Sequence, residues 1–323
     1  TGWSWAFPDS QLTEWSFQYG GFDYSVAKDQ RIDLKRMRAY PGMHSTAEKR
    51  LFPGKAHAVT IQPQSSATES LRIALDTLFN HPNVGPFIGR QLIQKLVTSN
   101  PSPAYVARVA STFNNNGAGV RGDLAAVVRA VLLDVEARNS AAVSPGKLRE
   151  PVLRVTHWMR SFDATSQSGQ YLMAHELDTQ SQRALHAPSV FGYFRPGFVP
   201  PNTSFSAGNV TLPEFQIVSE STTAQWVNMA MAMTTSGLGW TPTGKDVSTS
   251  LDTLVGFAAA SDVDGLIERL NLLLFAGRMS ASLRQDMLDA VTAVTGIYPT
   301  ANLNRARVAL FLALASPEYL VQP

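Results

Sequence analysis

Residues 66–79, SATESLRIALDTLF, carry apolar side chains at intervals of three and four positions. Leu71, Leu75, Leu78 and Phe79 therefore fall on one face of an α-helix. The same period recurs along most of the chain that follows, and prolines mark the ends of the periodic segments. The sequence thus predicts a mainly α-helical protein.

The predicted helices form two groups that we expect to pack together. Residues 66–162 make the first helical group and residues 213–323 make the second. Residues 163–212, between them, are predicted to be a loop that contains a turn rich in aromatic residues and proline. The individual helices are predicted at residues 66–80, 84–98, 103–115, 122–138 and 147–162, and then at 213–234, 249–259, 262–275, 280–294 and 302–315.

The N-terminal segment, residues 1–65, lacks a helical period and is predicted to be irregular. It is rich in aromatic residues spread among glycines and polar residues. Residues 49–61, KRLFPGKAHAVTI, place a Pro-Gly pair between two short stretches that favour extended backbone. This pattern predicts one short β-hairpin.

The turn between the two helical groups is residues 187–202, APSVFGYFRPGFVPPN, with four aromatic rings, four prolines and two glycines. Prolines fix φ and glycines permit positive φ, so such a run forms a rigid turn of defined shape. The turn has too few polar side chains to form a catalytic site by itself. We expect its rings to act as a wedge between the two helical groups.

Composition excludes several classes of function. Of the 323 residues, 44% are hydrophobic and 16% are charged, and 27 basic residues face 25 acidic ones. This near balance, without basic clusters, argues against nucleic-acid binding. The absence of cysteine excludes disulfides, thiolate nucleophiles and cysteine-based metal sites. The longest apolar runs are shorter than the roughly 18 residues of a transmembrane helix.

Several segments together resemble the bacterial family named domain of unknown function 1800. They are residues 37–54 (MRAYPGMHSTAEKRLFPG), 81–97 (HPNVGPFIGRQLIQKLV), 101–113, 147–159 (KLREPVLRVTHWM), the turn at 187–202 and residues 316–322 (SPEYLVQ). The resemblance follows the family order and covers nearly the whole chain. It implies that this chain is the C-terminal portion of a longer member.

The resemblance also implies a cellular context. Members of the family look like exported bacterial proteins, periplasmic or secreted, and they are often encoded beside another uncharacterised family, domain of unknown function 1501. Export and a protein partner from that second family are therefore expected by analogy. The activity of the family is not established.

One departure from the family pattern changes a predicted boundary. Residues 127–136 resemble residues 308–318, and the family tends to place proline before glutamate at the end of this helix. The second copy keeps Pro317-Glu318, whereas the first has Val135-Glu136. Without the proline we expect the first helix to continue toward Arg138.

The best catalytic candidate is His44 with Glu48 and Lys49, since an imidazole beside a carboxylate and an ammonium can make an acid–base site. These residues lie in a non-helical stretch, where functional side chains are frequent. The same residues could instead cap and hold the hairpin that follows. A Gly-x-Ser-x-Gly element and a phosphate-binding glycine loop are both absent from the sequence.

A metal site has no support from spacing. His157, His175 and His186 could meet carboxylates such as Glu150 and Asp178, but no His-Glu-x-x-His and no pair of histidines on one helical face occurs. His157 falls within a predicted helix and is expected to pack or hydrogen-bond there. We expect neither a metal nor a cofactor.

Aromatic residues suggest a binding role. Trp3, Trp5, Tyr193 and Phe194, with Arg195 beside them, could stack on sugar rings or fill a pocket of a partner. Alternatively, the rings attach the irregular segments to the helices. We expect an exported helical binding or structural module that acts with a protein partner or a cell-envelope polymer. The alternative is a hydrolase built on His44, Glu48 and Lys49, with Arg195 as an anion contact.

Overall fold

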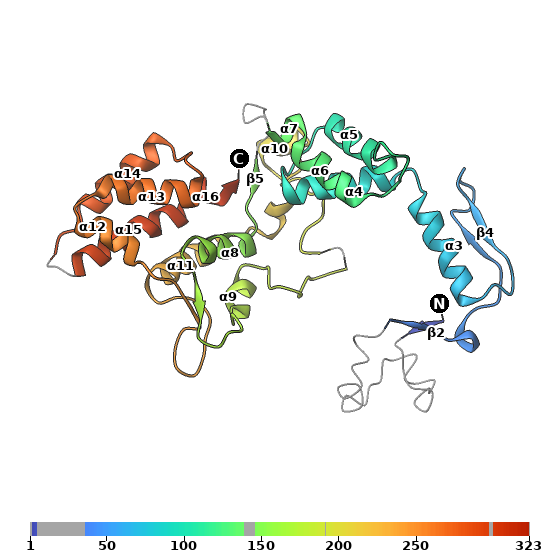
Figure 1. The fold of residues 1–323 in the computed structure, drawn as a ribbon, viewed down its shortest axis with the longest axis horizontal. Coiled ribbons are helices and arrows are strands. Elements are labelled where there is room, and N and C mark those ends of the chain that lie inside the picture. The colour runs from blue at the N-terminus through green and yellow to red at the C-terminus, as the bar shows by residue number, and fades with distance from the viewer. Residues whose placement is uncertain (1, 5–35, 139–145, 191, 297–299, 323) are drawn as a thin grey trace. The chain divides into compact units, whose positions relative to one another are not determined.

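The computed structural model describes residues 2–4, 36–138, 146–190, 192–296 and 300–322 (Figure 1). Its described part is mainly α-helical with a few short strands, which confirms the predicted fold class. The chain divides into two units, Thr1–Phe87 and Ile88–Pro323, and each is described by itself.

The described part of the first unit contains two small sheets, a short 3-10 helix and helix α3 (Ala67–Phe79). Strand β1 (Trp3–Ser4) pairs with β2 (Arg38–Ala39), and a short 3-10 helix, η3 (Pro41–Met43), follows. Strands β3 (Lys49–Leu51) and β4 (Val59–Ile61) form the predicted antiparallel hairpin. Helix α3 (Ala67–Phe79) begins where the Ser66 hydroxyl accepts a hydrogen bond from the Glu69 amide. Helix α4 (Val84–Leu96) crosses the boundary between the units.

The second unit opens with a helical layer. Helix α5 (Pro103–Asn114) packs on α6 (Leu124–Leu133), and Tyr105, Val109, Val127 and Val131 are buried between them. Its next helix, α7 (Val135–Arg138), is one turn long. The apolar side chains of this helix pair are therefore buried, whereas the apolar face predicted for α3, with Leu71, Leu75, Leu78 and Phe79, is exposed.

The predicted continuation of the first helix toward Arg138 is wrong. The backbone at Asp134 is extended, with φ −60° and ψ 149°, and it ends α6. The Asp134 carboxylate accepts the Glu136 amide at 2.9 Å and pairs with Arg108 at 2.7 Å. Asp134 thus caps a new helix as Ser316 does before α16 (Pro317–Leu320), so a proline is not needed for the break.

The C-terminal helices lie beside one another (Figure 1) and contribute most of a buried hydrophobic cluster. Helix α15 (Thr300–Ala315) packs on α11 (Glu220–Thr235), α12 (Asp252–Ala259), α13 (Val263–Phe275) and α14 (Ala281–Thr292), and α13 also contacts α8 (Pro151–Ser161). The indole nitrogen of Trp226, on α11, donates to the Leu314 carbonyl at 3.0 Å. Burial of such large side chains supplies the main stabilisation of this region.

The single helix predicted at residues 213–234 is also wrong. The structure has a 3-10 helix, η4 (Pro213–Ile217), followed by a break before α11. The break arises because Val218 is extended and Ser219 forms a capping box with Thr222, which starts a new helix. This break places Glu214 and Trp226 on separate elements of the same unit.

Short strands and helices complete the second unit. Strand β5 (Lys147–Leu148) pairs with β8 (Val321–Gln322), and β6 (Thr165–Ser166) pairs with β7 (Val247–Ser248). The segment at 163–212 also contains α9 (Ala174–Thr179) and α10 (Ser204–Ala207). Within the described ranges, no helix combines the length and the apolar character needed to span a membrane.

Candidate functional site

A buried ionic cluster lies in the second unit, around Lys147 at the start of β5. Lys147 is 1% exposed, and its ammonium donates to the Lys95 carbonyl at 2.7 Å. The same nitrogen lies 3.5 Å from Glu150 Oε1 and 3.8 Å from Glu214 Oε1. One buried cation therefore serves two buried carboxylates that come from different elements.

The two carboxylates have unequal sets of partners. Glu150 pairs with Lys95 at 3.1 Å and accepts from the Gln182 amide at 2.6 Å. Glu214 accepts from the Ser99 hydroxyl at 2.8 Å through Oε2, while its Oε1 has no hydrogen-bond donor in the described part of the chain. Glu150 is thus well satisfied and Glu214 is only half satisfied.

These environments move the two pKa values in opposite directions. Burial raises the pKa of Glu214, and its bond from Ser99 and the charge of Lys147 offset this only in part. Burial also acts to raise the pKa of Glu150, but the charges of Lys95 and Lys147 outweigh it and lower the pKa. At neutral pH Glu150 is the ionised partner of the cluster, and Glu214 retains a proton more readily.

A small cavity of about 130 Å³ lies beside the aromatic turn and has Glu214 in its wall. Gln94, Tyr193 and Phe194 also line it. The Gln94 amide nitrogen donates to the carbonyls of Ser99 and Pro196 at 2.9 and 2.8 Å, which fixes the orientation of the amide. Gln94 Oε1 is left without a donor among the described residues, so two residues of the cavity wall, Gln94 and Glu214, each have one buried oxygen without a hydrogen-bond partner.

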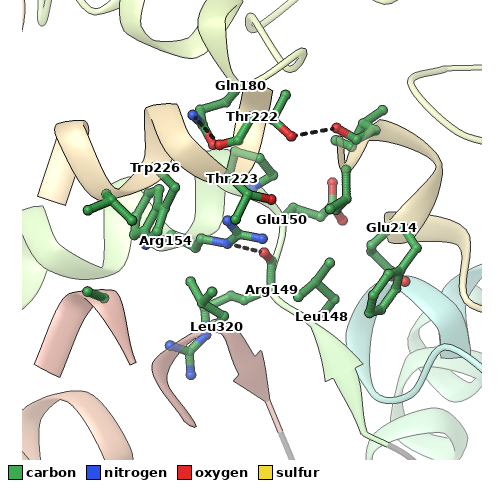
Figure 2. A pocket seen from close by; sticks show the side chains of 16 residues that line it. Leu148, Arg149, Glu150, Arg154, Gln180, Glu214, Thr222, Thr223, Trp226 and Leu320 are labelled. Atoms are coloured by element: carbon green, nitrogen blue, oxygen red, sulfur yellow. Dashed lines mark hydrogen bonds between the residues drawn. The ribbon is translucent and has the colours of Figure 1, made fainter. Parts of the chain in front are cut away.

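A larger cavity of about 240 Å³ lies between α8, η4 and α11 (Figure 2). Figure 2 shows the Arg154 guanidinium in the middle of its lining, with Trp226 on one side and Glu150 on the other. The guanidinium carbon lies 5.1 Å from the centroid of the Trp226 ring. Glu214 lines this cavity as well, so it contributes to both.

The described part of the aromatic turn contains a glycine at positive φ and two half-buried rings. Gly192 adopts φ +95°, which residues with a Cβ rarely do, and its amide bonds to Ser189 at 3.1 Å. Tyr193 and Phe194 are half-buried; the Tyr193 hydroxyl donates to the Arg183 carbonyl, and the Lys95 ammonium lies 4.1 Å from the centre of the Phe194 ring. Arg195 is exposed and its backbone amide bonds to Gln216.

The structure therefore brings Tyr193 and Phe194 to a cavity, which the neighbouring Arg195 does not line. Trp3 lies in the first unit, where its indole nitrogen donates to the Ala67 carbonyl at 3.2 Å. Trp5 lies outside the described residues.

The predicted acid–base residues also lie in the first unit. His44 Nε2 lies 3.1 Å from the Ser70 hydroxyl of α3. Glu48 forms an exposed ion pair with Arg50 at 2.6 Å, and the Lys49 ammonium donates to the backbone carbonyls of Ser45 and Ala47. The bonds of Glu48 and Lys49 thus hold the start of the hairpin, whereas His44 faces a serine.

No three histidine, aspartate or glutamate side chains gather as metal ligands within the described residues. His157 Nε2 lies 3.0 Å from the Leu273 carbonyl, and its ring stacks on Tyr319. Burial lowers the pKa of His157, and the charge of Arg149 lowers it further. His157 thus packs and hydrogen-bonds within the core of the second unit.

Sequence reasoning missed Gln94, Lys147, Arg154 and Glu214. One signal was available in residues 147–154, KLREPVLR, where four charged side chains come close to the apolar face of a helix. Charged residues are rarely buried without a partner, so such a pattern marks a buried polar cluster. No comparable pattern in the sequence indicates that Glu214 belongs to this buried cluster.

Comparison with protein families gives one result. The family model described as "Protein of unknown function (DUF1800)" matches residues 1–321. Comparison with curated proteins and with solved structures finds no match. The family match spans essentially the whole chain and includes the cavities and the aromatic turn. The chain belongs to the DUF1800 family of proteins of unknown function.

Proposed function

We propose that the protein is an exported helical binding module that takes a hydroxyl-rich polymer of the cell envelope at the cavity beside the aromatic turn. The observation that carries the proposal is the pair of buried oxygens without a hydrogen-bond partner in the described chain, Gln94 Oε1 and Glu214 Oε1. A buried polar atom without a partner is costly, and a ligand hydroxyl, which can both donate and accept, gains binding energy by pairing with these oxygens.

The remaining lining fits the same ligand class. The half-buried rings of Tyr193 and Phe194 offer apolar surface for the C–H face of a sugar. The cavity of about 130 Å³ is small and takes one unit of a chain rather than a large ligand. A ligand that bears donors and an apolar face thus matches both parts of the wall.

The test is calorimetric titration with soluble cell-wall glycan fragments of two to four sugars, and with maltotetraose for comparison. We expect saturable binding of one glycan class. Phe194→Leu removes the ring while it keeps an apolar side chain, and should weaken binding at least fivefold. Phe205→Leu is the matched control, because Phe205 lies on α10 and does not line the cavity.

A cavity that holds only water would give no saturable binding with any glycan. Equal affinity of the Phe194→Leu and Phe205→Leu variants would also contradict the proposal. Glu214→Gln provides a further check, since it keeps an oxygen acceptor and should retain most of the affinity.

A protein partner would use the neighbouring loop. Leu185 and Val190 are 102% and 95% exposed, and every residue from 184 to 190 is exposed. Aliphatic side chains that bury nothing in the chain itself are typical of a contact surface. The partner implied by the family resemblance is a DUF1501 protein, and size-exclusion chromatography of the two purified proteins tests it. Separate elution would contradict this part of the proposal.

A hydrolase remains the second candidate, favoured by the approach of His44 to Ser70. An imidazole within hydrogen-bond distance of a hydroxyl can take up its proton, as in nucleophilic catalysis. Ser70 is 6% exposed, so a substrate would need an opening above it. Labelling by a fluorophosphonate probe, lost in Ser70→Ala and His44→Ala, would support this candidate; absence of labelling in the native chain would remove it.

A further inference from the structure

Arg154 is a buried cation whose guanidinium has most of its donors free. The side chain is 6% exposed, and within the described residues its one hydrogen bond runs from Nε to the Arg149 carbonyl at 2.6 Å. A guanidinium carries five N–H donors, and this bond uses only the one on Nε. The four donors on the two terminal nitrogens therefore have no acceptor in the described chain. The guanidinium carbon lies over the Trp226 ring, 5.1 Å from its centroid, so the indole contacts a face of the guanidinium.

No carboxylate of the described chain pairs with Arg154. Glu150 lines the same cavity, but its charge is already balanced by Lys95 and Lys147. Glu214, which also lines it, retains a proton more readily because burial raises its pKa. The cavity thus has an uncompensated positive charge at Arg154, an expensive arrangement unless an anion completes it.

The rest of the lining limits the kind of anion. Apolar side chains make up most of the wall, among them Phe215, Ile217, Val218 and Trp226. Inorganic phosphate or sulfate would leave these surfaces without a partner, whereas an organic acid would cover them. The volume of about 240 Å³ is below the roughly 300 Å³ at which pockets for drug-sized ligands begin, so the ligand is small.

We infer that this cavity binds a small organic carboxylate, whose apolar body lies against Trp226 and Phe215 and whose two oxygens accept from the free edge of Arg154. A planar guanidinium and a planar carboxylate match in a bidentate pair. The carboxylate belongs either to a free aliphatic acid or to the C-terminus of a peptide with an apolar last residue. This cavity is distinct from the glycan cavity of the proposed function, although Glu214 lines both.

The experiment is calorimetric titration of the whole chain with sodium hexanoate, with hexanamide as the uncharged analogue. Hexanoate should bind saturably at one site, and hexanamide should bind at least tenfold more weakly. Arg154→Lys keeps the charge but loses the planar fork, and should weaken hexanoate at least tenfold. Arg160→Lys is the matched control, since Arg160 is exposed on the same helix.

A second pair of variants avoids the risk that a change at Arg154 disturbs folding. Val227 lines the cavity and is 43% exposed, so it accepts a charge. Val227→Glu should weaken hexanoate, and Val227→Lys should leave it unchanged or strengthen it. Equal affinities of these two variants, or of Arg154→Lys and Arg160→Lys, would overturn the inference.

Two further probes define the ligand class. The first is an acetylated dipeptide that ends in leucine, tested with a free and with an amidated C-terminus. If the dipeptide with the free C-terminus binds more tightly than hexanoate, the carboxylate belongs to a peptide. Binding of inorganic phosphate without binding of hexanoate would overturn the carboxylate assignment. The Phe194→Leu variant should bind hexanoate normally, so failure of this inference and failure of the glycan proposal are distinguishable.

Discussion

The Tyr319 hydroxyl donates a hydrogen bond of 2.6 Å to the backbone carbonyl of Arg154. This bond ties α16, near the C-terminal end of the chain, to α8, which bears the guanidinium in the larger cavity. Both residues are buried, and burial raises the pKa of Tyr319. The hydroxyl therefore stays protonated and remains a donor at neutral pH.

Removal of this hydroxyl should lower stability. Tyr319→Phe leaves the ring in place and removes one buried hydrogen bond, so the free energy of unfolding should fall by about 1 kcal/mol. Tyr171→Phe is the control, because Tyr171 is 44% exposed and should change stability by less than about 0.5 kcal/mol. Urea unfolding measures both, and equal stabilities would show that the Tyr319 bond contributes nothing.

The two partners of the ion pair between Glu150 and Lys95 should contribute unequally to the free energy of unfolding. Glu150→Gln leaves the Lys147 ammonium buried with a poorer partner and should cost about 3 kcal/mol. Lys95→Gln removes the exposed partner of the pair between Lys95 and Glu150. Because the Lys95 side chain is 53% exposed, this change should cost less than about 1 kcal/mol. The denaturant midpoints of unfolding compare the two variants. A similar loss of stability in both would mean that Glu150 does not stabilise the protein through the buried Lys147.

Local signals in the sequence were sufficient for most helices and insufficient for the sites. Helices α3 and α5 begin one residue after Ser66 and Ser102, whose hydroxyls cap them, and both helices end within a residue of the predicted positions. Capping and helical period are properties of neighbouring residues, so the sequence exposes them.

Other features depend on contacts between distant segments. The break at Asp134 involves Arg108 of another helix, and Ser99 meets Glu214 across 115 positions. The free acceptors and the free guanidinium edge exist only because these distant residues converge. The charge pattern of residues 147–154 marks buried charges but not the partners that they meet, so the candidate site appeared only with the fold.

His157 should make stability depend on pH in a specific window. Burial lowers its pKa below the ordinary value of 6.5, so the folded chain favours the neutral ring. The stability that this neutral ring contributes is present above pH 6.5 and is lost as pH falls through the lower folded pKa. Unfolding measured from pH 7.5 to 5 should therefore show a steeper decline for the native chain than for His157→Gln. His175→Gln, at an exposed position on α9, is the control and should decline as the native chain does.

Substitutions in the exposed loop beside the aromatic turn should affect binding of a partner but not the stability of the protein. Because Leu185 and Val190 are fully exposed, Leu185→Ser and Val190→Ser remove no buried apolar surface. Each should change the free energy of unfolding by less than about 0.5 kcal/mol. Where a protein partner covers the loop, the same changes should weaken the complex, since apolar area buried at an interface contributes to affinity. Thermal unfolding of the isolated chain and chromatography with the proposed DUF1501 partner test the two halves independently. A large loss of stability in the isolated chain would mean that these side chains pack within the protein, and the loop would lose its role as a contact surface.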